Sequence, residues 1–96
     1  MPSLTLAPAI ARWLTAEASS RGEIRIEVSG VTLREAFDNP FLRHPILRDY
    51  IVDQRGALRH HVVAFIDNES VGDKASLAEP LTPASEIYVF QALSGG

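Results

Sequence analysis

A strand pattern that leads directly into one well-marked helix start sets narrow limits on the fold of this chain. Glu23 to Val28 alternate polar and apolar residues without a break, and a period of two indicates a strand with one buried face. Thr32-Leu33-Arg34-Glu35 follows soon after. The Thr32 hydroxyl can accept a hydrogen bond from the Glu35 amide, and the Glu35 carboxylate can reach back toward the helix start, which is a capping box. A strand followed closely by a capped helix favours the α+β class.

Four further segments are predicted to be strands. Alternation in Leu4–Leu6 and the apolar run that closes Leu58–Ile66 are typical of strands, and Ser70-Val71 can form a short return strand after a turn. Glu86–Phe90 is apolar on both faces, which indicates a central strand. The predicted order is strand, strand, helix and three more strands.

The helix is predicted to end at Asp38-Asn39-Pro40, because the residue before a proline disfavours helical backbone angles. The next segment, Phe41 to Val52, is compatible with a second helical turn that starts at Pro45. Ile10, Trp13 and Leu14 continue an apolar pattern that fits either a strand or a helical turn.

Together these elements predict a β-grasp, or ubiquitin-like, domain over residues 1–91. In this arrangement a mixed sheet of about four to five strands carries one main helix across it. The first and last strands can pair as parallel neighbours. Residues 92–96 are expected to form a flexible C-terminal tail.

Composition argues against several classes of function. The 96 residues include no cysteine, so disulfides and thiolate chemistry are excluded. The net charge is -3, and no basic stripe suited to nucleic acid is present. No apolar run reaches the roughly 20 residues that span a membrane, and no signal-peptide pattern is visible, so we expect a cytoplasmic protein. The sequence has no GxxxxGK[ST] loop, so we expect ATP to be bound by a partner.

The sequence ends in Gly95-Gly96, shortly after the last predicted strand. Glycine averages about 7% of residues, so two glycines at one fixed place arise by chance in roughly one chain in 200. Glycine has no Cβ, which lets a Gly-Gly end enter a narrow channel. The residues 92–96 reach at most about 17 Å when extended. The alternative is a frayed terminus without a role.

On these features the chain resembles the ThiS/MoaD group of ubiquitin-related sulfur carriers. The resemblance is carried by Leu4–Leu6, the helix start at Val31–Ala36, the middle hairpin from Leu58 to Glu69, and Glu86–Phe90 leading to Ser94-Gly95-Gly96. The segment from His44 to Gly56 resembles the CysO-type carriers of cysteine biosynthesis more than the shorter ThiS, and the chain as a whole resembles CysO and MoaD-type members most. Pro83-Ala84-Ser85-Glu86 and Gln91 stand where the family usually has a Gly-Asp turn and a proline, so the branch of the family stays open.

The resemblance implies a function centred on the carboxylate of Gly96. An E1-like enzyme would adenylate this carboxylate with ATP, with Gly95 beside it. Sulfur transfer would then give a thiocarboxylate that donates sulfur in the biosynthesis of cysteine, molybdopterin or another thio-metabolite. The chain would be a protein carrier and not an enzyme, and would bind no cofactor itself. The implied partners are the adenylating enzyme, a sulfur-accepting biosynthetic enzyme and a metalloprotease that trims or releases the tail.

Four residues are predicted to contact these partners. Family members dock through an exposed aromatic residue near the last strand, which points to Phe90, and a plain core residue is the equally open alternative there. The sequence leaves the same two roles open for Phe65, a docking contact or a core residue. Leu93 has no core to join in a tail, and Ser94 lies next to it.

No metal site is expected from the sequence. His60-His61 is the one suggestive pair, but neighbouring residues on a strand point to opposite faces and cannot easily share an ion.

Two other functions fit the same features. A ubiquitin-like modifier would be joined to lysines through Gly96, which an isopeptide bond to a target would reveal. A β-grasp interaction module would use only its folded surface, and its function would survive deletion of Gly96.

Overall fold

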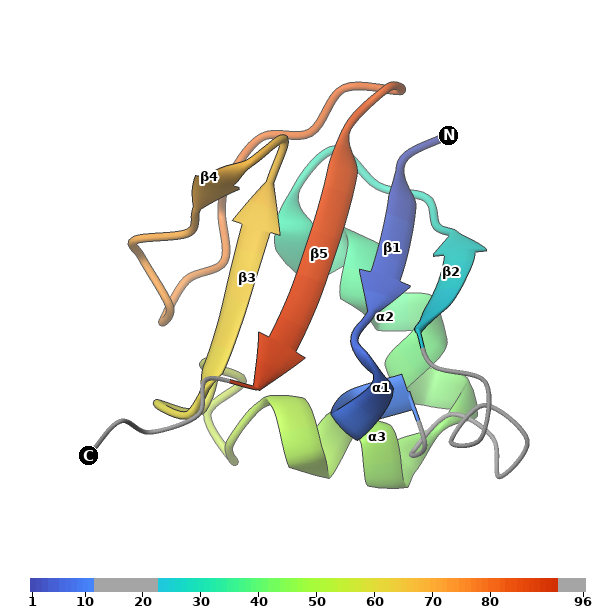
Figure 1. Ribbon diagram of the computed structural model, residues 1–96. Coiled ribbons are helices and arrows are strands. Elements are labelled where there is room, and N and C mark those ends of the chain that lie inside the picture. Colours follow the sequence, from blue (N-terminus) through green and yellow to red (C-terminus); the bar gives the residue numbers. More distant parts are fainter. Residues whose placement is uncertain (12–22, 92–96) are drawn as a thin grey trace.

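The computed structural model describes residues 1–11 and 23–91, which form a five-stranded sheet with helices packed on one face (Figure 1). Trp13, Leu14 and the tail 92–96 lie outside the described residues. No helix within the described residues is long and apolar enough to cross a membrane. In chain order the elements are β1 (Ser3–Leu6), α1 (Pro8–Ala11), β2 (Ile24–Glu27), α2 (Leu33–Arg43), α3 (Pro45–Ile51), β3 (Val62–Ile66), β4 (Glu69–Ser70) and β5 (Glu86–Gln91).

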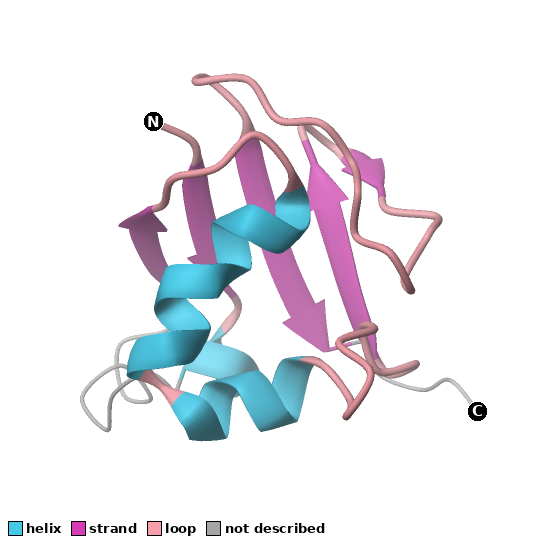
Figure 2. Ribbon diagram, turned by 180° about the vertical axis from the view of Figure 1, so that it is seen from behind, coloured by secondary structure: helices cyan, strands magenta, loops and turns pink. Residues whose placement is uncertain are grey.

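The sheet has the strand order β2-β1-β5-β3-β4, so the last strand is central, as predicted. β1 and β5 are parallel, with Leu4 opposite Ile87 and Leu6 opposite Val89. The pairs β1–β2, β3–β5 and β3–β4 are antiparallel. Figure 2 shows α2 crossing the back of the sheet, with α3 beneath it. The predicted mixed sheet with one main helix across it is therefore confirmed.

The core lies between α2 and the covered face of the sheet. Leu4, Leu6 and Val89 point into it from the sheet, and Leu33 and Phe37 meet them from α2; all five are at most 1% exposed. Burying a side chain of this size contributes about 1.5–3 kcal/mol. The alternation in the strands and the apolar face of the helix thus bury the same set of residues.

The start of α2 confirms the predicted cap. The Glu35 amide donates to the Thr32 hydroxyl oxygen at 3.2 Å. The Glu35 carboxylate accepts from the Val31 amide at 2.9 Å, one residue before the cap. Gly30 precedes this turn with φ +144, and a Cβ there would lie 2.7 Å from the Glu35 Cβ. The chain entering α2 therefore requires glycine at this position.

The predicted end of the helix at Asp38-Asn39-Pro40 is wrong, because α2 continues through Pro40 to Arg43. An internal proline costs about 3 kcal/mol. Pro40 is itself buried, and the next residue, Phe41, stacks on Phe37 with ring centroids 4.8 Å apart. This packing offsets the missing hydrogen bond. The helix ends at Arg43 and is capped by His44, whose amide donates to the Pro40 carbonyl. Pro45 then starts α3, as the sequence predicts.

The predicted strand Leu58–Ile66 is too long, since β3 begins only at Val62. The amide of Leu58 donates to the Lys74 carbonyl, and that of Arg59 donates to the Ile51 carbonyl at the end of α3. The Val62 amide closes a turn on the Arg59 carbonyl at 2.9 Å. The amides of Leu58 and Arg59 are thus bound by a loop and a helix end, so these two residues do not extend the β3 ladder, which begins at Val62. The return strand is likewise shifted by one residue, to Glu69–Ser70.

Candidate functional site

One face of the sheet is left uncovered by α2 and α3, which lie on the opposite side, while α1 lies at the end of the sheet where β1 stops (Figures 1 and 2). Successive residues of a strand point to opposite faces. Ile87 and Val89 of β5 are buried in the core, so Tyr88 and Phe90 lie on the uncovered face, where both are partly exposed. On β3, Phe65 lies on the same face and is also partly exposed.

Val63 of β3 is also partly exposed and faces Phe90. These four residues, Val63, Phe65, Tyr88 and Phe90, form one continuous surface, which we call the aromatic patch after its three rings. Strand register places Phe65 opposite Tyr88 and Val63 opposite Phe90. The ring centroids of Phe65 and Phe90 are 5.6 Å apart, and those of Tyr88 and Phe90 are 5.5 Å apart. Contacting aromatic rings at a surface supply much of the energy of protein interfaces. The aromatic patch is therefore a candidate docking surface.

Carboxylates border the aromatic patch at the start of β5. A shallow hollow of about 240 Å³ is lined by Phe65 and Tyr88 together with Glu23, Asp67 and Glu86. The Asp67 carboxylate accepts a hydrogen bond from the Glu86 amide at 2.9 Å, which holds it at the rim. The surface thus combines an apolar centre with an acidic border, a composition suited to a protein partner.

The C-terminal segment begins beside this patch. Gln91 ends β5, is paired with Val62, and is the last described residue. It follows Phe90 directly, so the residues that continue the chain start at the edge of the candidate docking surface. Gly95, Gly96, Leu93 and Ser94 lie outside the described residues, and their predicted roles stay predictions.

The structure brings together two predicted residues that sequence reasoning treated separately. Phe65 and Phe90 lie on neighbouring strands with their rings in contact. Sequence reasoning missed Tyr88, although the period of two in β5 places it on the same face as Phe90. Neither Phe65 nor Phe90 belongs to the buried core.

His60 and His61 lie in a turn before β3 and not on a strand, so the reason given for rejecting them as a metal pair does not apply. Their ring centroids are 5.9 Å apart. In the parts of the chain that the structure describes, no group of three or more His, Cys, Asp or Glu is placed to hold a metal ion.

The ring of His61 packs nearly perpendicular to the ring of Tyr50, and the environment of His61 opposes its protonation. Burial lowers its pKa below the ordinary value of 6.5, and repulsion from His60, Arg59 and Lys74 lowers it further. The unfolded chain therefore binds a proton at a higher pH than the folded chain.

The free energy of unfolding is expected to fall as the pH drops from about 6.5 toward the lowered pKa of folded His61, because unfolding takes up a proton in this window. Urea unfolding followed by circular dichroism at several pH values measures this slope. His61→Gln is expected to reduce it. His60→Gln is the control and should keep most of it, since burial of His61 is the larger cause. An unchanged slope in His61→Gln would contradict the assignment.

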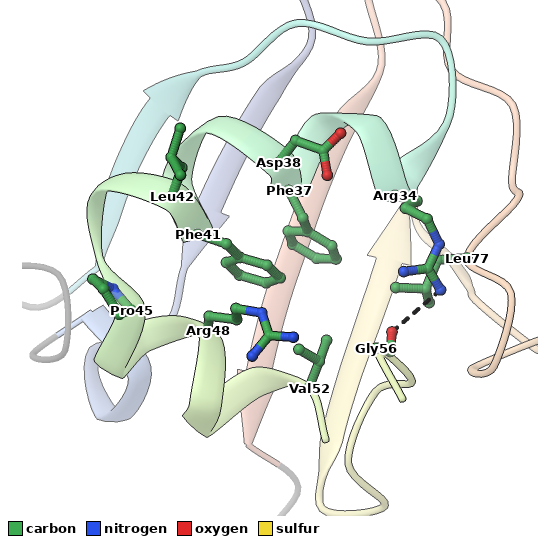
Figure 3. A pocket seen from close by; sticks show the side chains of 10 residues that line it. All are labelled: Arg34, Phe37, Asp38, Phe41, Leu42, Pro45, Arg48, Val52, Gly56 and Leu77. Carbon is green, nitrogen blue, oxygen red and sulfur yellow. Dashed lines mark hydrogen bonds between the residues drawn. The ribbon is translucent and has the colours of Figure 1, made fainter. Parts of the chain in front are cut away.

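A second hollow, of about 420 Å³, lies on the helix side between α2 and α3 (Figure 3). Phe37 and Phe41 line it, with Arg34 and Arg48 at its rim. The Arg34 guanidinium donates to the backbone carbonyls of Gly56, Ala75 and Ser76, so it ties two loops to α2. Arg48 is paired with Asp49 at 3.3 Å. Both cations thus have structural partners, and the hollow offers no paired groups for acid–base chemistry.

The sheet order, the parallel pairing of β1 with β5 and the helix across one face define a β-grasp, ubiquitin-like domain, which confirms the predicted fold class. No protein-family model and no curated protein sequence matches the chain.

Solved structures of ubiquitin-like proteins do match over nearly the whole chain. SAMP1 (small archaeal modifier protein 1) of Haloferax volcanii has a TM-score of 0.71 and 23% identity, covering 99% of this chain and 98% of its own. CysO, from the BexX/CysO complex of Amycolatopsis orientalis, has a TM-score of 0.70 and 23% identity, covering 97% and 99%. Urm1 of Trypanosoma brucei has a TM-score of 0.67 and 16% identity, covering 99% and 94%. The predicted resemblance to ubiquitin-like carriers and modifiers is confirmed at the level of the fold.

Proposed function

We propose that this chain is a sulfur carrier that works through the carboxylate of Gly96. The observation that carries the proposal is that β5 bears Tyr88 and Phe90 of the aromatic patch and is followed in sequence by the segment 92–96, which ends in Gly95-Gly96. A partner docked on Tyr88 and Phe90 would lie where the C-terminal segment begins. Docking surface and reactive end are then parts of one strand and its continuation.

The chemistry explains why a partner enzyme is needed. A free α-carboxylate has a pKa of about 3.5 and is ionised at neutral pH, so it is a poor electrophile. Attack of a Gly96 carboxylate oxygen on the α-phosphorus of ATP releases pyrophosphate and gives an acyl-adenylate. A sulfide sulfur from a donor then attacks the carbonyl carbon and AMP leaves, so that one oxygen is replaced by sulfur. The chain is a protein substrate in this scheme, and the activating enzyme binds ATP.

The proposed partners follow from the scheme. They are an E1-like adenylating enzyme, a sulfur-accepting biosynthetic enzyme and a metalloprotease that trims or releases the tail, acting in the cytoplasm. The similarity to CysO, which was solved in complex with BexX, supports docking of such a domain on a partner protein.

The intact mass of the protein after incubation with ATP, sulfide and a candidate activating enzyme from the same genome tests the proposal. The expected result is a mass increase equal to the replacement of one oxygen by sulfur. Omission of ATP is the control and should leave the mass unchanged. An unchanged mass with several candidate enzymes, each active on its own carrier, would overturn the proposal.

The similarity to a small archaeal modifier protein favours a second candidate function, conjugation of Gly96 to lysines of other proteins. Both functions begin with the adenylate, so they diverge only at the nucleophile. Mass spectrometry of tryptic digests from the source cells separates them. Trypsin cleaves after Lys74 and finds no later Lys or Arg, so a remnant of residues 75–96 on target lysines appears only with conjugation.

Loss of the aromatic patch is expected to weaken docking to the activating enzyme. Phe65→Ala removes a ring that contacts Phe90 without touching the core. An interface hot spot contributes about 2 kcal/mol or more, so the KM for the carrier should rise at least about 30-fold. Steady-state release of pyrophosphate measures this KM. Ile46→Ser, at an exposed position on α3, is the matched control. An equal KM for Phe65→Ala and wild type would show that the aromatic patch does not contact the activating enzyme.

A further inference from the structure

The point where β5 ends is fixed by a side chain from a distant part of the sequence. The hydroxyl of Tyr50, on α3, donates a part-buried hydrogen bond to the Gln91 side-chain oxygen Oε1. Figure 1 shows α3 passing under the end of β5, close to where the chain leaves the sheet. The Gln91 backbone is also held, because Gln91 pairs with Val62 of β3. Both the main chain and the side chain of this last described residue are therefore constrained.

Tyr50 is itself held in place. Its neighbour Ile51 and the nearby Leu47 are fully buried, which anchors α3 under the sheet. The ring of His61 meets the ring of Tyr50 edge to face, with centroids 5.5 Å apart. The hydroxyl thus comes from a ring fixed both by its helix and by a neighbouring side chain.

We propose that Tyr50 is a positioning residue for the activation of Gly96. The Tyr50–Gln91 hydrogen bond fixes the position of Gln91, the residue that precedes the segment 92–96. With Gln91 fixed, the Gly96 carboxylate has fewer orientations relative to the domain, so more of them reach the partner's active site. Fixing the geometry of a reacting group in advance lowers the barrier of a step without new contacts in that step. This inference rests on the proposed sulfur-carrier function, and it gives the α3 segment a role outside the docking surface.

The test is Tyr50→Phe in the full chain, which removes the hydroxyl and keeps the ring that packs on His61. Losing one such hydrogen bond is expected to lower the kcat of adenylate formation by about three- to tenfold. KM should stay unchanged, because the aromatic patch is intact. Ser76→Ala is the matched control, since it removes an exposed hydroxyl bonded to Asp73 and should leave both constants unchanged.

Two readouts separate positioning from general stability. The ¹⁵N relaxation order parameter of the Gln91 amide is expected to fall in Tyr50→Phe, while that of Val89 stays the same. Gln91→Leu should reproduce the loss of kcat, and Gln91→Glu, which keeps an acceptor oxygen, should restore most of it. The double variant Tyr50→Phe/Gln91→Leu should be no slower than either single variant.

The outcomes are distinguishable from a failure of the proposed function. If wild-type protein forms the adenylate and Tyr50→Phe matches it in kcat, the positioning role is overturned and the carrier function stands. If wild-type protein forms no adenylate with several candidate enzymes, each active on its own carrier, the carrier function is overturned and the positioning role with it. The relaxation measurement then still decides whether Tyr50 restrains Gln91.

Discussion

Deletion of Gly96 is expected to abolish formation of the thiocarboxylate while leaving the folded domain unchanged. The deletion shortens the C-terminal segment by one residue, which removes about 3.3–3.6 Å of reach. A displacement of only about 1 Å from the productive geometry can cost a factor of about 100 in rate. The new terminal carboxylate, on Gly95, therefore falls short of the reacting centre. Intact mass and pyrophosphate release with the activating enzyme measure the loss.

Two comparisons make this result specific. Adding one alanine after Gly96 displaces the carboxylate in the opposite direction and should be equally inactive. Both variants should unfold at the same urea concentration as wild type, because neither changes a residue of the described core, which runs from Leu4 to Val89. Full activity of the deletion variant would exclude Gly96 as the attachment site and favour a module that works through its surface alone.

Phe37→Ala is expected to cost about 3–5 kcal/mol of stability. Phe37 is 1% exposed, lies on the face of α2 that covers the sheet, and stacks on Phe41. Its removal leaves a cavity in the centre of the core and takes away the contact that supports the helix beyond Pro40. The free energy of unfolding of a small domain is only about 5–15 kcal/mol, so this substitution removes a large part of it. Urea unfolding followed by circular dichroism gives the free energy directly.

The matched control for this substitution is Leu42→Ala, in the same helix but 83% exposed. A surface change of this kind normally stays within about 0.5 kcal/mol of wild type. Similar stabilities for the two variants would show that the packing of α2 on the sheet is not the main source of stability in this fold.

The sequence predicted correctly those elements that depend on contacts between residues close together in the chain. The alternation in Glu23–Val28 and the cap at Thr32 depend on contacts within a few residues, so both were found from sequence alone. The central position of β5 followed from apolar residues on both of its faces. The parallel pairing of the first and last strands was inferred from the order of elements, and it is confirmed.

Where the predictions were wrong, contacts between distant residues decided the outcome. Pro40 is a helix-ending signal locally, but its burial and the stacking of Phe41 on Phe37 carry the helix past it. Leu58 to His61 read as part of a strand, but the backbone amides of Leu58 and Arg59 donate to Lys74 and to the end of α3. No window of neighbouring residues contains this information.

The features of the candidate site likewise separate into those that the sequence predicted and those that only the tertiary structure shows. The sequence by itself determined the Gly95-Gly96 end, the strand that leads to it, and Phe65 and Phe90 as aromatic residues divided between core and surface. Only the tertiary structure decided that β3 lies beside β5, which joins Phe65, Tyr88 and Phe90 into one exposed patch. It also placed Tyr50 against Gln91 across 41 residues of chain. The physical reason is that a residue's type and local pattern fix which face it occupies, whereas its neighbours on that face depend on how the whole sheet and its helices pack.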